Sequence, residues 1–173
     1  MDTRRTVLLL GGVTLLGGCG FKLRQPPKLA FESIRSPGNF ATPVARELMR
    51  ALEQAGVRVL PPEPPRQPGL AQPETEPVDV VLDVLTDQRE RAVVGITATG
   101  QVRELQLRTR FRFRLRSGQG ADLIEDSELL QTRDISFTET AVLGKEAEEA
   151  LMYKDMQTDI VQQVLRRLSV IKR

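Results

Sequence analysis

Five arginines at alternate positions are the feature of this 173-residue sequence most suited to binding chemistry. In a β-strand, alternate side chains share one face and lie about 6.6–6.8 Å apart. The guanidinium fork suits phosphate and carboxylate groups. We call these residues the arginine strip: Arg108, Arg110, Arg112, Arg114 and Arg116. The strip is either a binding surface for an anionic ligand or partner, or a solvated face neutralised by acids such as Asp83 and Asp87 on a neighbouring strand.

A single lysine, Lys145, stands where the last predicted helix begins, a position at which the helix dipole favours acids. Three glutamates follow it, at positions 146, 148 and 149. Pairing with Glu149, one turn further along, would be a purely structural role. The other interpretation is that Lys145 binds an anionic ligand, and the residues alone leave both open.

The only cysteine, Cys19, follows the tripeptide Leu16-Gly17-Gly18. A bulky apolar residue, two small residues and a cysteine are typical of the lipidation site of bacterial lipoproteins. The small residues let a signal peptidase approach the backbone, and the thiolate accepts the diacylglycerol. Gly20 stands where an aspartate would indicate retention in the inner membrane, which favours the outer membrane.

The residues before Cys19 have the features of a signal peptide. Arg4 and Arg5 precede an apolar stretch of 11 residues, 6–16, which is too short to span a membrane and typical of secretory signals. We therefore predict that residues 1–18 are removed, that Cys19 carries lipid, and that residues 19–27 are a short tether on the periplasmic side of the outer membrane.

Composition excludes several kinds of site. The chain has no histidine and one cysteine, so a Cys/His zinc site, a Ser-His-Asp triad and an internal disulfide cannot form. We expect no enzyme activity, no metal and no cofactor. The net charge of +2 is smaller than that of most nucleic-acid-binding domains, so no nucleic acid is expected as a partner.

Hydrophobic periodicity predicts the elements that must position these residues. Seven prolines in 17 residues make the segment 61–77 a loop. The remaining elements are strands at 28–36, 78–87, 104–116 and 127–137, a short extended piece at 57–60, and helices at 43–55 and 145–168. Thr42 is the predicted N-cap of the first helix, and Gly56 its C-terminal cap.

This order predicts an α+β fold in a single domain, residues 28–173. We expect a two-layer sandwich with a roughly four-stranded, mostly antiparallel sheet and two helices packed on one face, in the order β-α-β-β-β-α. Phe111 and Phe113 should lie beneath the helices. The arginine strip should then occupy the opposite face of the sheet.

Three segments of the sequence resemble those of the LPS-assembly lipoprotein family LptE. Cys19-Gly20-Phe21-Lys22-Leu23-Arg24 is similar to the family's Cys-Gly-aromatic start, and residues 100–107 (GQVRELQL) to its Gly-Gln turn and strand. The third segment, residues 145–168, keeps the family's register of a lysine, an acidic stretch, Lys-Asp-Met and a terminal Arg-Arg-Leu. The resemblance implies an outer-membrane lipoprotein that plugs the β-barrel LptD, assists its assembly and helps deliver lipopolysaccharide to the outer leaflet.

The same resemblance implies a lipopolysaccharide contact at the lysine that opens the last helix, Lys145. A second family contact, a basic residue in the turn before the Gly-Gln pair, falls near the uncharged Ala98 and Thr99, so that Arg103 or Arg91 would have to substitute. The candidate lipopolysaccharide-binding residues are therefore Lys145, Arg103, Arg108, Arg110 and Arg112. A different small outer-membrane lipoprotein, serving as an auxiliary subunit of an envelope export or assembly complex, is the alternative; a periplasmic enzyme has no motif in its support.

Overall fold

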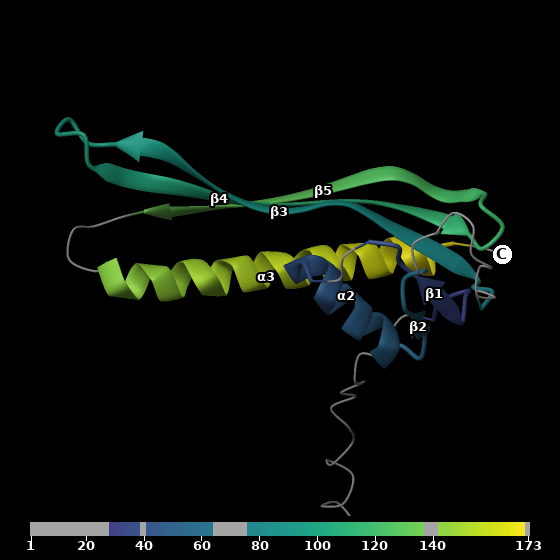
Figure 1. The fold of residues 1–173 in the computed structure, drawn as a ribbon. Coiled ribbons are helices and arrows are strands. Elements are labelled where there is room, and N and C mark those ends of the chain that lie inside the picture. Colours follow the sequence, from purple (N-terminus) through teal and green to yellow (C-terminus); the bar gives the residue numbers. More distant parts are fainter. Residues whose placement is uncertain (1–27, 39–40, 64–75, 137–141, 172–173) are drawn as a thin grey trace, which may run out of the picture.

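A computed structural model describes residues 28–38, 41–63, 76–136 and 142–171. The predicted signal peptide, Cys19 and the tether lie outside the described residues, as does most of the proline-rich segment. The elements, shown in Figure 1, are β1 (Ser33–Arg35), α2 (Pro43–Gln54), β2 (Arg58–Leu60), β3 (Val80–Ile96), β4 (Val102–Ser117), β5 (Asp122–Ser136) and α3 (Val142–Ser169).

The predicted α+β sandwich is confirmed, with α2 and α3 on one face of the sheet (Figure 1). The sheet differs from the prediction in having five strands in the order β2-β1-β3-β4-β5. The extended piece after α2 forms the extra strand, β2, which pairs parallel with β1, and β1 is also parallel to β3. The sheet is therefore mixed, because β1, α2 and β2 form a β-α-β unit whose helix packs back on the sheet.

The antiparallel strands β3, β4 and β5 extend further than the sequence pattern predicts. β3 has 17 residues and β4 has 16, and they remain paired as far as Ile96 opposite Val102. Polar and charged residues occupy both faces in the extra length, so hydrophobic alternation does not reveal it. Cross-strand pairs of opposite charge, such as Glu90 opposite Arg108, make such pairing favourable.

Two apolar clusters lie between the sheet and the helices. The larger contains Phe111 and Phe113 from β4, the apolar face of α2 and the C-terminal half of α3. The smaller, beneath the N-terminal half of α3, consists of Leu107, Ile135, Tyr153 and Met156. The sandwich is thus thickest where the two helices cross and thinner toward the start of α3.

The N-terminus of α2 is capped by a strand residue. Thr42 occupies the predicted N-cap position, but its side chain makes no capping hydrogen bond. Instead, the backbone N–H groups of Val44 and Ala45 each donate to Asp87 Oδ2 at 3.0 Å. The register shifts between Val84 and Thr86, which places Asp87 on the helix side of the sheet. The prediction that Asp87 neutralises the arginine strip is therefore wrong.

Replacing Asp87 by alanine should lower the free energy of unfolding by about 1–2 kcal/mol, since two N–H groups of the first turn of α2 lose their acceptor. Asp87→Asn keeps an acceptor oxygen and should recover most of that loss. Urea unfolding of the two variants and the wild type measures the difference. Equal losses for alanine and asparagine would show that capping is not the role of Asp87.

Arg35 joins both ends of the proline-rich segment to the sheet. Its side chain is only 8% exposed and pairs with Glu63 at 2.9 Å. It also donates to the carbonyl oxygens of Pro61, at 3.2 Å, and Glu76, at 2.7 Å. A buried guanidinium is stable only when its donors are satisfied, and here they are satisfied by residues from the two ends of the segment. The chain therefore leaves β2 and returns to β3 at one fixed place.

Candidate functional site

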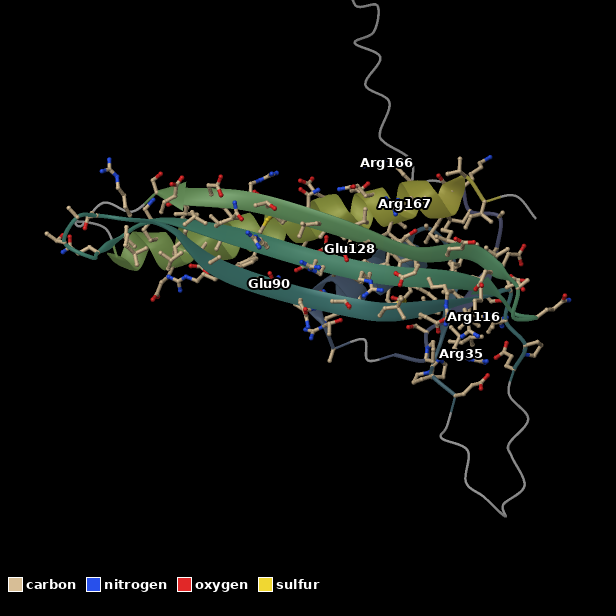
Figure 2. All side chains as sticks on the ribbon, turned by 90° about the horizontal axis from the view of Figure 1, so that it is seen from above. Arg35, Glu90, Arg116, Glu128, Arg166 and Arg167 are labelled. Carbon is tan, nitrogen blue, oxygen red and sulfur yellow. The ribbon has the colours of Figure 1, made fainter. Side chains whose placement is uncertain are left out.

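The arginine strip lies on the face of the sheet that the helices leave open. Along β4, buried and half-buried residues alternate from Leu105 to Arg116, with every arginine among the half-buried ones. Figure 2 views this face from above and shows Glu90 and Glu128 on the strands to either side of β4. The predicted orientation is thus confirmed, with Phe111 and Phe113 completely buried on the other face.

Acidic residues from β3 and β5 neutralise the middle of the strip. The Arg110 guanidinium lies 3.9 Å from Glu90 and 3.5 Å from Glu128. Arg112 bonds to Asp126, and lies 3.9 Å from Glu128. The hydrogen bond between Arg112 and Asp126 raises the pKa of the guanidinium and lowers the pKa of the carboxyl. These arginines are therefore already bound to carboxylates.

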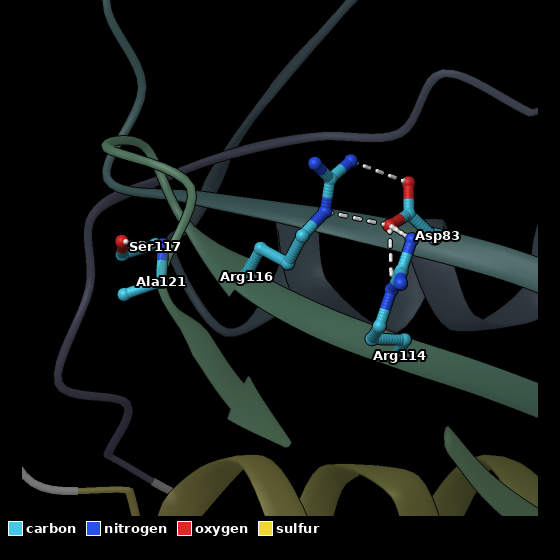
Figure 3. Close-up of polar contacts among 5 residues, drawn as sticks. All are labelled: Asp83, Arg114, Arg116, Ser117 and Ala121. Atoms are coloured by element: carbon cyan, nitrogen blue, oxygen red, sulfur yellow. Dashed lines mark hydrogen bonds and ion pairs between the residues drawn. The ribbon is translucent and has the colours of Figure 1, made fainter. Parts of the chain in front are cut away.

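The end of the strip is held by one largely buried aspartate, shown in Figure 3. Asp83 Oδ2 accepts from Arg114 Nη2 at 3.1 Å and from Arg116 Nε at 2.8 Å, while Oδ1 accepts from Arg116 Nη2 at 3.1 Å. The hydrogen bond to Asp83 raises the pKa of Arg116, against the opposing effect of burial. The predicted neutralising role of Asp83 is confirmed.

Arg108 is the exception within the strip. Its Nε donates to Gln106 Oε1 at 2.8 Å, and no carboxylate of the described chain lies within ion-pair distance. The geometry therefore supports a neutralised, solvated face for four of the five arginines. Only Arg108 keeps a charge without an acidic partner.

A second surface lies at the turn between β3 and β4, which projects beyond the first turn of α3 (Figure 1). Four apolar side chains are exposed there: Val93 (54%), Val94 (48%), Ile96 (66%) and Val102 (42%). We call this surface the hairpin end. The turn itself is closed by hydrogen bonds from Thr97 N to Gln101 O and from Gly100 N to Thr97 O. Sequence reasoning missed this surface, although the run of valines next to a predicted turn was a usable signal.

Three of the predicted cations belong to the end of β3, the start of β4 and the first turn of α3. Arg103 is exposed and is the residue of β4 that the register shift between Gly95 and Ile96 leaves unpaired; no ion pair of Arg103 is found within the described part of the chain. Arg91 of β3 lies 3.7 Å from Glu149 on α3. Lys145 lies in the first turn of α3, where its Nζ donates to Glu148 Oε2 at 2.8 Å. Lys145 thus pairs with a glutamate of its own helix, as the structural interpretation expects, but the partner is Glu148, and Glu149 lies close to Arg91 instead.

The sheet consequently divides the predicted site residues into two groups. Arg103 belongs to the β3–β4 hairpin and Lys145 to the first turn of α3, whereas Arg108, Arg110 and Arg112 lie on the open face of the sheet. A single ligand headgroup would contact one group or the other. The group at the hairpin end combines cations with exposed apolar side chains, and the group on the open face combines arginines with carboxylates.

Tyr153 fixes α3 against β3 near this end. Its hydroxyl donates to Glu90 O at 2.7 Å, and the Arg89 guanidinium lies 5.0 Å from the ring centroid. Burial, with a further effect from Glu149, raises the pKa of the phenol. The start of α3, and with it Lys145, is therefore held at a defined position relative to β3.

Two kinds of site were not found among the described residues. No group of His, Cys, Asp and Glu in the described ranges is arranged to hold a metal ion. No helix in those ranges has the length and apolar character needed to cross a membrane.

Comparison with known proteins identifies the family of this chain. The sequence model of the LptE family, described as lipopolysaccharide-assembly, matches residues 27–168. The chain belongs to the LptE family. A solution structure of an uncharacterized lipoprotein B from Nitrosomonas europaea is 30% identical to this LptE-family chain, with a TM-score of 0.66, and the match covers 87% of this chain and 90% of that one. No curated protein sequence matched.

Two more distant structures share the fold. A minor lipoprotein from Acinetobacter baumannii is 19% identical with a TM-score of 0.59, covering 82% of this chain and 92% of that one. The rare lipoprotein B from Shewanella oneidensis is 20% identical with a TM-score of 0.58, covering 78% and 89%. This LptE-family chain is thus an envelope lipoprotein with a role in lipopolysaccharide assembly.

Proposed function

We propose that this LptE-family protein is anchored in the outer membrane through lipid on Cys19, faces the periplasm, and plugs an LptD-like β-barrel. It assists assembly of the barrel and helps deliver lipopolysaccharide to the outer leaflet. The lipid anchor follows from the lipidation motif at Cys19. Membership of the family supports the partner and the cargo.

The hairpin end is the observation that best supports handling of lipopolysaccharide. Lipopolysaccharide is amphiphilic, with phosphates on its glucosamine headgroup and several acyl chains. A protein surface for it needs cations beside apolar side chains. Clusters of exposed apolar side chains mark interaction sites more often than single ones do, and at the hairpin end the exposed apolar residues lie on the same two strands as Arg91 and Arg103.

Copurification tests the proposed barrel partner. When this protein is isolated with an affinity tag from detergent-solubilised outer membranes, we expect one large β-barrel protein in equal molar amount. Mass spectrometry identifies the partner, and quantitative staining gives the ratio. Recovery of subunits of a different envelope export or assembly complex, without a barrel of the LptD type, would favour an auxiliary role in that complex instead.

Cys19→Ala should release the protein from the membrane while leaving the domain folded. Each buried CH₂ of a lipid chain contributes roughly 0.8 kcal/mol to membrane binding, and the described domain has no membrane-spanning helix to replace it. Cell fractionation in a strain depleted of the barrel partner measures the effect, and circular dichroism checks the fold. Firm retention of the alanine variant in that strain would disprove the anchor.

A further inference from the structure

A pocket lies at the end of the sandwich opposite the hairpin end, where the C-terminus of α3 meets the β4–β5 turn (Figure 1). Its volume is about 580 Å³, within the range of sites that hold small organic groups. Apolar side chains supply much of its wall. The lining comes from four parts of the chain: residues 30–31, 77–80, 117–119 together with Leu123, and Ile171.

Hydrogen bonds fix the walls of this pocket. Gly118 N donates to Asp79 O at 2.8 Å, and a Cβ at position 118 would lie 1.8 Å from Val78 O, so the turn packs directly on the backbone before β3. Asp79 Oδ2 in turn accepts from Glu32 N at 2.9 Å and from Ser33 N at 3.0 Å. The pocket is therefore preformed, and it does not depend on loops that must close.

The pocket lies where the tether enters the domain. The described chain begins at Lys28, and Ala30 and Phe31 already belong to the pocket wall. Upstream, the only large apolar side chains of the tether are Phe21 and Leu23, which share one face of an extended chain. The five residue steps from Leu23 to Lys28 span up to roughly 17 Å, and Pro26-Pro27 favours the extended polyproline II conformation within that stretch. The tether is thus long enough to reach back to the pocket.

We propose that Phe21 and Leu23 bind in this pocket. Their side chains would cover the exposed parts of Leu123 and Ile171. The side chains of Lys22 and Arg24, at the alternate positions of the tether, would then point to solvent. Cys19 would then lie within about 7 Å of the pocket, two residues away. The lipid would hold this end of the domain at the membrane surface and direct the hairpin end away from it. The proposal does not depend on lipopolysaccharide binding.

Because the chain contains no tryptophan, a Phe21→Trp variant carries a single fluorescent reporter of the docked position. The protein is produced from residue 19 onward with Cys19→Ser, a form that keeps every described residue and needs no detergent. We expect blue-shifted emission and protection from acrylamide quenching in Phe21→Trp. In Lys22→Trp, the matched control on the other face of the tether, emission should be that of exposed tryptophan.

Two further substitutions in the Phe21→Trp background identify the pocket as the binding place. Leu123→Asp puts a charge in the wall at a side chain that is already 38% exposed, and it should restore solvent-exposed emission; Leu123→Ser is a milder version if the aspartate lowers stability. Ile96→Asp makes the same kind of change at the hairpin end and should have no effect. Exposed emission from Phe21→Trp itself, or buried emission that survives both Leu123 changes, would overturn the proposal.

Discussion

Phe111→Ala and Phe113→Ala are each expected to lower the free energy of unfolding by about 3–5 kcal/mol, a large part of the stability of a domain of this size. Both rings are completely buried, and they stack with centroids 5.8 Å apart. Each alanine substitution loses the free energy that the ring gains on transfer from water to the core, and it leaves a cavity between β4 and the helices. Urea unfolding followed by circular dichroism measures the loss.

Leu130→Ala is the control for this prediction. Leu130 lies on the neighbouring strand β5 and is 48% exposed, so its loss should change stability by less than about 0.5 kcal/mol. The double variant of Phe111 and Phe113 should fall short of the sum of the single losses, because the two rings contact each other. Small effects of the single phenylalanine changes would contradict the position of the core.

Strand β4 could be predicted because its sequence alternates without interruption. Leu105 to Leu115 are apolar at every second position apart from Thr109, and Gln106 and four arginines fill the positions between. When one face of a strand must be buried, apolar residues at every second position determine which face that is. The same alternation predicts the orientation of the arginine strip, because the arginines fall on the face opposite the phenylalanines.

The role of Asp87 could not be predicted, because it depends on a β-bulge. Counting alternate residues along β3 places Asp83 and Asp87 on one face, yet the extra residue at Leu85 moves Asp87 to the other. Nothing local in the sequence marks that residue as a bulge. The benefit of the bulge is tertiary, since it brings a carboxylate to the N-terminus of α2.

The two short strands, β1 and β2, were also difficult to predict from the sequence. β1 and β2 have three residues each, so that the strand predicted at 28–36 was too long and the extended piece at 57–60 was not expected to join the sheet. They are strands because parallel neighbours complete their hydrogen bonds, with Ile34 opposite both Val59 and Val80. α2, in contrast, has local signals at both ends: Pro43 at its start, and Gly56 with a φ of +87° after its end.

For the candidate site, the sequence identified the charges but not most of their partners. It named Asp83 but not Asp126, Glu90 and Glu128 as the acids that neutralise the arginine strip, because the ion pairs of these three depend on the registers of β3 and β5 against β4. It also could not show that Glu149 lies close to Arg91, or that Lys145 pairs with Glu148. Within the described ranges, Arg103 and Arg108 have no acidic partner, whereas Lys145 is paired with Glu148. Arg103 and Arg108 are therefore the cations most available to an anionic headgroup.

Reversing the charges at the hairpin end, with Arg103→Glu and Lys145→Asp together, should weaken binding to purified lipopolysaccharide by about tenfold or more, since hydrogen bonds to charged groups contribute about 1.5–3 kcal/mol each. Thermal stability should change little, because exposed ion pairs contribute only about 0–1 kcal/mol and an acid in the first turn of α3 suits the helix dipole.

The matched control for this prediction is Arg110→Glu with Arg112→Glu, which changes the net charge equally but on the open face of the sheet, where carboxylates already occupy both guanidinium groups. Binding curves at low and high salt measure both variants, and the difference should shrink as salt screens the charges. A weaker effect at the hairpin end than on the open face would assign the lipopolysaccharide headgroup to the arginine strip. Unchanged binding in both variants would show that neither surface of this LptE-family protein is an ionic site for lipopolysaccharide. Its role in lipopolysaccharide transport would then depend on how the protein fits within a barrel.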